Sequence, residues 1–422
     1  MATIAPATEG LTTADGVSLK VSLARANARS RRRALLLVLP LLAFLTVTFV
    51  LPILDMLYRG IENSVVPETF TRTTAVIGQW DPDTAELPPE SIYEAMVGDL
   101  KEAYASKSLG SAARRLNYDL PGVSSLFRKS GRRANRIEEG PYKDALLKID
   151  KAWGEPAIWR LLHRESGAYT ASYFLAAVDM RYDEQGDVAP QPEYRQIYLR
   201  LFGRTLMLSV VITVLCLLLG YPVAYLLATL PLRTSNLLMV MVLLPFWTSL
   251  LVRTTSWIAL LQTQGVINDL LVLVGIVSDD GRLQMMHNQV GTIVAMTHIL
   301  LPFMILPLYS VMKTIPPSYM RAARSLGANP LTAFVRVYLP NTVAGIGAGS
   351  ILVFILAIGY YITPALVGGQ SGTLISNFIA DHISTTLNWG LAAALGVLLL
   401  GIVLALYFLY DKIVGIDNMK LG

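Results

Sequence analysis

The sequence contains long apolar runs separated by polar stretches, and each run is long enough to cross a lipid bilayer. Crossing about 30 Å of hydrocarbon takes about 20 helical residues. Because lipid offers no partners for backbone N–H and C=O groups, these runs are expected to be helices. Six spans are predicted: 34–57, 203–229, 235–261, 290–312, 343–366 and 391–410. The sequence therefore predicts an all-α membrane protein with six transmembrane helices.

Composition argues against an enzyme acting alone. Charged residues make up 15% of the chain, against about 25% in a soluble domain. No Gly-x-x-x-x-Gly-Lys-Ser/Thr motif is present, so the usual cradle for nucleotide phosphates is missing. The four histidines and the single cysteine, Cys216, show no metal-ligand spacing. We therefore predict no catalytic residue, no cofactor and no metal site.

Lysine and arginine predict the orientation. The positive-inside rule counts these residues in tails and short loops. On one side of the predicted spans lie Lys20, Arg25, Arg29, Arg31, Arg32, Arg33, Arg233, Lys313, Arg321, Arg324, Arg336, Lys412 and Lys420. The short loops on the other side, 262–289 and 367–390, hold only Arg282. Both tails, 1–33 and 411–422, are therefore predicted to be cytoplasmic, and the net charge of +5 gives no reason to expect a nucleic-acid partner.

A long polar segment, 58–202, separates the first predicted span from the second. With the orientation above it faces the periplasm. Apolar residues recur at helical spacing in 91–105 and 142–153, and no strand-like alternation stands out. The segment is therefore predicted to be a mostly helical periplasmic insertion, followed by a transmembrane core over 203–410.

The loop over 313–342, after the fourth predicted span, has strong local signals. Pro316 and Pro317 end that span, and Ser318 is a suitable N-cap for a short helix. Gly327 can close this helix in the left-handed conformation, and Pro330 suits the first turn of a second helix. We predict a helix–turn–helix at the membrane surface, which Pro340 ends.

One face of the first short helix is small and apolar: Tyr319, Ala322, Ala323 and Leu326. A helix this short is hardly stable alone in water, so it needs a surface to pack on. Two interpretations remain open from the residues alone. The helix docks in a groove of another protein, or it is an amphipathic connector that lies on lipid headgroups.

This stretch resembles the EAA loop of ABC importer permeases. Ala322 and Ala323 match the two alanines of that pattern, Gly327 its glycine, and Leu339 and Pro340 its ending, all at the family spacing. Arg321 departs from the family, which usually has Glu there. The resemblance implies the fold of a type I importer permease and a loop that docks on an ATPase.

Further segments resemble the polyamine branch of this family, the spermidine/putrescine permeases. They are Leu244-Pro245-Phe246-Trp247-Thr248, Gly265-Val266-Ile267-Asn268, Leu301-Pro302-Phe303, Thr363-Pro364-Ala365-Leu366-Val367-Gly368-Gly369 and Asn388-Trp389-Gly390. The resemblance implies transport of a polyamine across the bacterial inner membrane. It also implies two ATPase subunits, a second permease subunit, often a paralogue, and a periplasmic substrate-binding protein as partners.

Ionisable residues inside membrane spans are rare and therefore candidates for function. Arg253 lies within the third predicted span, where it lines the solute path or pairs with Asp269. Asp55, near the end of the first span, could attract a cation. Tyr360 and Tyr361, in the fifth, could offer aromatic faces to an ammonium group. Each of these has an ordinary structural interpretation as well, and His298 is interpreted as a packing residue.

Two other functions remain as alternatives. The same branch includes permeases for opines and other amino-acid derivatives, and the positive charge of Arg253 would suit such an anionic solute. An ion-coupled secondary transporter would need buried carboxylates and often an internal repeat, and the spans offer few acids.

Overall fold

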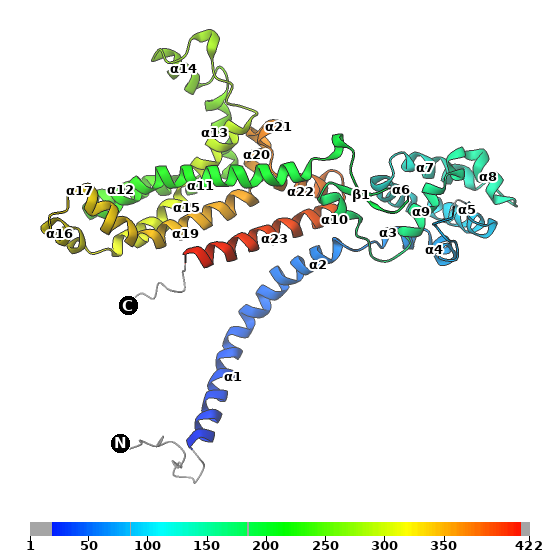
Figure 1. Ribbon diagram of the computed structural model, residues 1–422, viewed down its shortest axis with the longest axis horizontal. Coiled ribbons are helices and arrows are strands. Elements are labelled where there is room, and N and C mark those ends of the chain that lie inside the picture. Colours follow the sequence, from blue (N-terminus) through cyan, green and yellow to red (C-terminus); the bar gives the residue numbers. More distant parts are fainter. Residues whose placement is uncertain (1–18, 85, 184, 415–422) are drawn as a thin grey trace. The chain divides into compact units, whose positions relative to one another are not determined.

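The computed structural model describes residues 19–84, 86–183 and 185–414 (Figure 1). Its elements are almost all helices, which confirms the predicted all-α class. The chain divides into two compact units, residues 1–58 and residues 59–422. Of the two predicted tails, residues 1–18 and 415–422, with Lys420, lie outside the described residues.

The first unit is a long apolar helix. It comprises α1 (Leu19–Leu45), the π-helical segment η1 (Thr46–Val50) and α2 (Leu51–Arg59), whose last residue belongs to the second unit. In and beside η1, the Thr46 and Thr48 hydroxyls donate hydrogen bonds to the backbone carbonyls of Leu42 and Phe44, at 2.8 and 2.7 Å. Ser30–Arg59 is long and apolar enough to cross a membrane, and the predicted span 34–57 lies within it.

The 58–202 segment belongs to the second unit, apart from its first residue, and folds into short helices around its own core. The helices are α3 (Val65–Thr69), α4 (Thr71–Ile77), α5 (Glu90–Ala105), α6 (Leu109–Asp119), α7 (Val123–Ala134), α8 (Tyr142–Ile149), η2 (Lys151–Gly154), α9 (Pro156–Arg164), α10 (Ser172–Ala177) and η3 (Glu193–Arg195). Large aromatic side chains fill the core, among them Trp153, Trp159 and Phe127, and their rings contact one another. Burial of such rings dominates the stability of small cores.

A small β-hairpin interrupts this mostly helical segment. β1 (Met180–Tyr182) pairs antiparallel with β2 (Val188–Pro190). With three residues each, the strands are too short to show an alternating pattern in sequence. Just before β1, the buried Asp179 carboxylate accepts hydrogen bonds from the backbone N–H groups of Ile197, Tyr198 and Leu199, at 3.0, 3.0 and 2.9 Å. It thereby caps the helix that follows.

That helix, α11 (Tyr198–Thr229), packs against α15 (Gln289–Thr314), which in turn packs against α19 (Val343–Gly359) (Figure 1). Glycines bring α15 and α19 close together. A Cβ at Gly345 would lie 3.2 Å from the Leu308 Cα, and one at Gly349 would lie 2.7 Å from the Met304 Sδ. Small residues at helix crossings favour packing in membranes. α23 (Trp389–Val414) completes the set of long apolar helices.

Two of the predicted spans are broken. Among the described residues, four helices are long and apolar enough to cross a membrane, and the number reaches six if each of two bent pairs is counted as one span. The predicted 235–261 span divides into α12 (Leu232–Leu243), η4 (Leu244–Trp247) and α13 (Leu250–Leu261), and the pair that ends in α14 (Val266–Leu273) is bent by 97°. Pro245 and the extended Thr248 and Ser249 account for this break.

The predicted 343–366 span ends early, at Gly359. A continuous helix through Pro364 would leave the Tyr360 carbonyl without its backbone donor. In the structure the Ser376 hydroxyl donates to the Tyr360 carbonyl and the Asn377 amide to the Tyr361 carbonyl, both at 2.6 Å. The chain continues through α20 (Ile362–Val367), α21 (Gly369–Gly372) and α22 (Ile375–Ser384).

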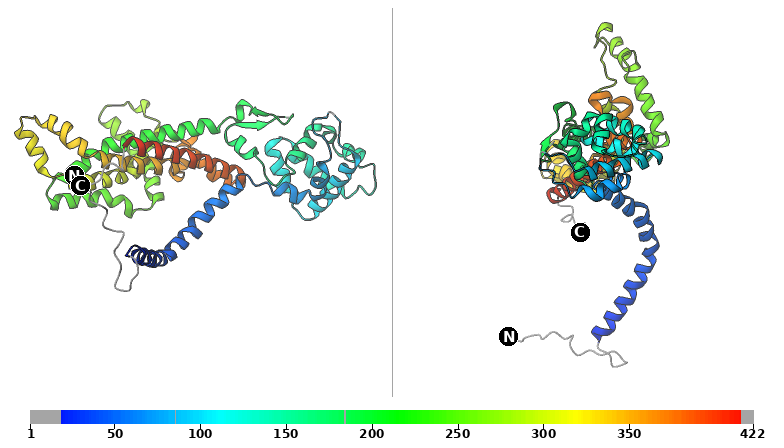
Figure 2. Two further views of the ribbon diagram at one scale, coloured as in Figure 1. Left: turned by 60° about the horizontal axis from the view of Figure 1, so that its bottom comes forward. Right: turned by 90° about the vertical axis from the view of Figure 1, so that its right-hand side faces the viewer.

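The two ends of α11 contact different parts of the second unit. Its first residue, Tyr198, still belongs to the 58–202 segment. Near its last turn, the Ala228 carbonyl accepts a hydrogen bond from Lys313 at 3.3 Å. The 313–342 loop therefore lies at the end of the helices opposite the 58–202 segment, as Figures 1 and 2 show. A helix of this length spans about 48 Å.

Candidate functional site

The 313–342 loop contains two short helices joined by a turn. α16 (Pro317–Ser325) begins with Pro317 at its first position and has Pro316 as N-cap. The prediction that Ser318 caps this helix is therefore wrong, because proline at the first helical position places Ser318 inside the first turn. α17 (Pro330–Ala333) follows, and there the Asn329 side chain accepts a hydrogen bond from the Thr332 N–H at 2.7 Å.

Gly327 makes the turn between these helices. Its φ of +90° lies in the left-handed region, as the sequence predicts, and a Cβ there would meet nothing within 4 Å. The backbone conformation, and not crowding, therefore favours glycine. Pro340 does not end the second helix: it lies inside α18 (Leu339–Asn341), and the 60° bend towards α19 comes two residues later, at Thr342.

The second half of the loop is fixed to α11 by aromatic side chains. The π-helical segment η6 (Phe334–Tyr338) places Phe334 edge-on to Tyr221 and Tyr225, with ring centroids 6.2 and 5.8 Å apart. The Tyr225 ring also lies 5.2 Å from the Tyr338 ring. The loop is thus anchored to the bundle, which suits a segment that transmits force.

The first half of the loop presents an apolar face to the outside. Leu326 is 89% exposed, and Leu331, in α17, is 71% exposed. Tyr319 and Ala322 are exposed as well, whereas Ala323 is only half-buried and Met320 packs against the bundle. The four residues predicted to share one face therefore divide: Ala323 turns towards the chain, and the other three point away from it. Arg321 is exposed beside them.

A second group of candidates gathers around Arg253 in α13. The Arg253 guanidinium is half-buried, lies close enough to His298 and Tyr360 to interact with them electrostatically, and its Nε is buried without a hydrogen-bond partner in the part of the chain that the structure describes. The Trp257 indole donates a hydrogen bond to the His298 Nδ1 at 3.0 Å. Four polar or aromatic side chains from α13, α15 and the end of α19 thus meet at one place.

The predicted alternative for Arg253, a pair with Asp269, is wrong. Asp269 forms an ion pair with Arg282 at 2.7 Å, and Arg282 also pairs with Asp279 at 2.8 Å. Asp269 lies on α14, and the chain after α14 brings Arg282 to it. Sequence patterns did not indicate the hydrogen bond between Trp257 of α13 and His298 of α15.

The other predicted candidates are Tyr360, which belongs to this group, Tyr361 and Asp55. Tyr360 and Tyr361 lie at the break after α19 and not inside a span, and of the two only Tyr361 is exposed. Asp55 lies on α2, in the first unit, and is exposed there. Among the described residues no group of His, Cys, Asp or Glu could hold a metal ion.

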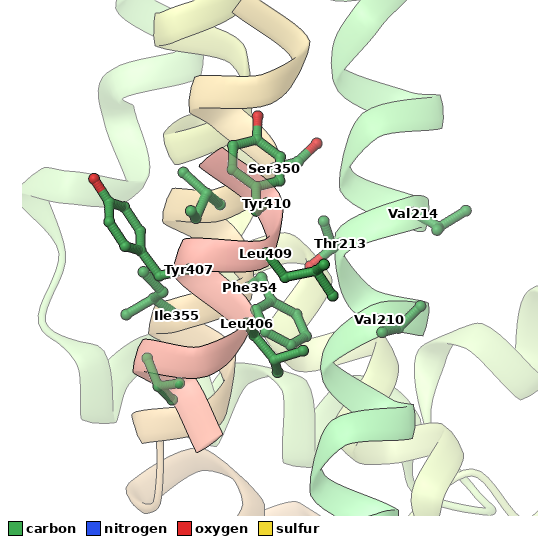
Figure 3. Close-up of a pocket in the computed structure, with 12 residues that line it drawn as sticks. Val210, Thr213, Val214, Ser350, Phe354, Ile355, Leu406, Tyr407, Leu409 and Tyr410 are labelled. Carbon is green, nitrogen blue, oxygen red and sulfur yellow. The ribbon is translucent and has the colours of Figure 1, made fainter. Parts of the chain in front are cut away.

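An apolar pocket of about 310 Å³ lies between α11, α19 and α23 (Figure 3). Figure 3 shows Phe354, Leu406 and Leu409 beside Thr213 in its wall. The Thr213 hydroxyl already donates to the Ser209 carbonyl at 2.7 Å. A charged solute would lose its hydration here and gain few polar contacts in return, so the pocket is a poor candidate for the solute path.

Comparison with known proteins covers both candidate groups. The family described as "Binding-protein-dependent transport system inner membrane component" matches residues 217–414. This range includes the 313–342 loop and Arg253, but not the 58–202 segment.

Individual relatives match a similar length of the chain. The spermidine/putrescine transport system permease protein PotB of Haemophilus influenzae is 34% identical over 227 residues, which cover 54% of this chain and 79% of that protein. PotB of Escherichia coli K12 is 34% identical over 215 residues, 50% of this chain and 78% of that protein. The E. coli inner membrane ABC transporter permease protein YdcU is 32% identical over 222 residues, 50% and 70% of the two chains.

Proposed function

Because this chain belongs to the family of inner membrane components of binding-protein-dependent transport systems, we propose that it forms part of a solute path that separate ATPases drive through the 313–342 loop. The chain is a multi-pass permease of an ABC importer. The coupling role, the partners, the orientation and the solute are inferred below from the observations that support each of them.

The exposed apolar face of the 313–342 loop carries the proposal. Leu326, Leu331 and Tyr319 are large apolar side chains that this chain does not cover. Exposed apolar side chains rimmed by polar ones are typical of protein interfaces. Arg321 and Arg324 flank the face, and both are exposed. We infer that an ATPase subunit covers this face, and that Ala322 and Gly327 allow the close backbone approach of such a contact.

Anchoring makes this face suitable for coupling. Leu339 and Pro340 continue from η6, whose aromatic side chains pack on α11, so a displacement of the docked helix would reach the bundle. The Tyr221 hydroxyl and the Thr342 hydroxyl lie 3.1 Å apart and form a further link at the bend before α19. Two ATPase subunits, one for this chain and one for a second permease subunit, complete the proposed assembly.

The orientation follows from the same arrangement. With the 313–342 loop at the ATPase side, both chain ends lie in the cytoplasm and the 58–202 segment lies in the periplasm. That segment is then on the side from which a substrate-binding protein delivers the solute. The basic residues near the loop, Lys313 and Arg336 among them, agree with the positive-inside rule.

A polyamine is the first candidate for the solute, because relatives named spermidine/putrescine permeases are 34% identical to this chain. An anionic amino-acid derivative such as an opine is the second candidate. One observation favours it: the Arg253 guanidinium is half-buried and forms no ion pair among the described residues. A buried positive charge of this kind repels an ammonium group and attracts a carboxylate.

Competition during uptake tests the two candidates. Cells that carry the complete transport system would be given labelled putrescine, with excess spermidine or excess opine as competitor. We expect spermidine alone to suppress the uptake. Suppression by the opine alone, or uptake of labelled opine in place of putrescine, would identify an anionic solute.

A separate experiment distinguishes the importer from a secondary transporter. The purified chain alone, in liposomes under an ion gradient, is expected to move no solute. Transport under these conditions would refute the coupling role of the 313–342 loop.

A further inference from the structure

A cavity of about 300 Å³ lies where the 58–202 segment meets the ends of α11, α22 and α23. None of the residues assigned above to coupling or to the solute path lines it. The volume is at the lower end of the range for small-ligand pockets, about 300–1,000 Å³. The cavity therefore has room for a compact metabolite-sized molecule.

Aromatic rings form much of the wall. They are Tyr118, Tyr173, Tyr182, Tyr194 and Tyr198. Three of these rings already carry a cation: the Arg115 guanidinium lies 4.5 Å from the Tyr173 centroid, the Arg164 guanidinium 4.6 Å from the Tyr182 centroid, and the Arg195 guanidinium 5.8 Å from the Tyr194 centroid. A positively charged ligand would therefore find these three rings occupied, with like charges next to them.

The charges of the wall do not cancel. Arg115 and Asp119 belong to a network with Arg164 and Glu165, in which two positive and two negative charges balance. Arg181, in β1, and Arg195, in η3, also line the cavity, and neither forms an ion pair in the described part of the chain. The Arg181 Nε is buried and has no hydrogen-bond partner there. The cavity thus contains two uncompensated guanidinium groups, one of which has an unsatisfied donor.

The histidine in the wall adds no charge that would change this balance. The His382 ring lies between two hydroxyls, that of Tyr198 at 2.9 Å from Nε2 and that of Thr386 at 3.0 Å from Nδ1. Burial also lowers the pKa of the His382 imidazole, so the ring is uncharged near pH 7.

We propose that this cavity binds a small organic anion with two carboxylate groups, which Arg181 and Arg195 hold against the tyrosine rings. Guanidinium groups bind carboxylates through paired hydrogen bonds, and an anion would satisfy the buried Arg181 donor. The ligand would contact the hairpin, η3 and the starts of α11 and α23 together, and would tie the 58–202 segment to the long helices. This site is independent of the proposed solute and of the coupling role.

Titration of the full chain with three matched compounds tests the proposal. The protein would be held in lipid nanodiscs and titrated with glutarate, with glutaramide as its neutral counterpart, and with putrescine as a dication. Heat of binding and the thermal unfolding temperature would be recorded. We expect glutarate to bind saturably and to raise the unfolding temperature, and the other two compounds to do neither.

Variants locate the binding. Arg181→Gln and Arg195→Gln are each expected to weaken glutarate binding at least about tenfold, since each removes one charge-assisted contact. Arg128→Gln, an exposed arginine on α7 outside the cavity, is the control and should bind as the parent chain does. Should Arg181→Gln fail to fold, Arg195→Gln on a separate turn carries the same test. Equal binding of glutaramide, binding of putrescine alone, or undiminished glutarate binding by the double variant would overturn the proposal.

Discussion

Arg115 and Glu165 form an ion pair of 2.7 Å in which the arginine side chain is 5% exposed and the glutamate side chain is fully buried. The pair joins α6 to the turn after α9. Both the Thr170 and Ser172 hydroxyls also donate to the same carboxylate, at 3.3 and 2.9 Å. The 58–202 segment therefore depends on one buried polar group as well as on its aromatic core.

Removing one partner of this pair should destabilise the segment strongly. Arg115→Ala removes the guanidinium 2.7 Å from the buried Glu165 carboxylate and leaves only that of Arg164, at 3.3 Å, so the expected loss is about 3 kcal/mol. Tryptophan fluorescence during thermal unfolding of the full chain would report it, because Trp153 and Trp159 lie in this core. Lys129→Ala, which removes a more exposed pair with Asp150 at 2.8 Å, is the control and should cost no more than about 1 kcal/mol.

That second pair predicts a pH dependence. The hydrogen bond from Lys129 lowers the pKa of the Asp150 carboxyl below its ordinary value. Because the folded pKa is depressed, the stabilisation is present above about pH 3.9, the ordinary value, and is lost as the pH falls through the folded pKa. The stability difference between the parent chain and Lys129→Ala should therefore disappear in strong acid. An equal difference at pH 7 and at pH 2 would contradict this assignment.

Gly327→Asp should abolish uptake while leaving membrane insertion intact. The new side chain would meet nothing within this chain, so the effect arises from the strained left-handed backbone and from the charge placed at the docking face. We expect at least about a tenfold loss of uptake and of ATPase co-purification, since a left-handed conformation at a non-glycine residue costs about 1–2 kcal/mol before any loss of contact.

Gly275→Asp is the matched control for that variant. Gly275 has a φ of +76° and equally open surroundings, but it follows α14 and lies outside the 313–342 loop. Its substitution should leave ATPase co-purification unchanged. Equal losses in both variants would mean that backbone strain alone, and not docking, explains the effect of Gly327→Asp.

Arg253→Gln should lower the KM for a polyamine. The substitution removes a half-buried positive charge that repels an ammonium group in the solute path. Uptake kinetics with putrescine would show the change, and Arg233→Gln, at an exposed position in the first turn of α12, should not show it. A higher KM for putrescine in the Arg253 variant would contradict this repulsion.

Gly345→Ala should reduce the thermal stability of the helices. The added Cβ would lie 3.1 Å from the Val311 Cβ and 3.2 Å from the Leu308 Cα, so α19 would have to move away from α15. Gly396→Ala, in α23, meets nothing within 4 Å. It should be neutral or slightly stabilising, because alanine favours a helix over glycine by about 1 kcal/mol. Circular dichroism during heating of the two variants would compare them.

Sequence patterns predicted the helical class and the turn at Gly327, because hydropathy and glycine conformation are local properties. They did not predict where helices break in the middle of an apolar run. Pro245 and Pro364 are each compatible with a kinked but continuous membrane helix. Whether the chain bends instead depends on distant donors, such as Ser376 and Asn377, that take over the freed carbonyls.

Pairings between side chains were equally hard to predict. Asp269 lies in the segment after the predicted third span and was considered as a partner for Arg253, but the chain after α14 brings Arg282 to it instead. Similarly, the outward face of α16 was assigned from spacing alone, and only the packing of Met320 shows that Ala323 turns inwards. Local spacing defines a face, whereas tertiary contacts decide its direction.

α11 is a single helix with Asp179 seated on its first backbone N–H groups and Lys313 fastened near its last turn. A continuous helix cannot shorten, so a displacement at one end of α11 reaches the other end as a tilt of the whole helix. For a length of about 48 Å, a tilt of 5° displaces the far end by about 4 Å. A small rearrangement around Asp179 would thus displace the residues near Lys313 while α11 stays helical.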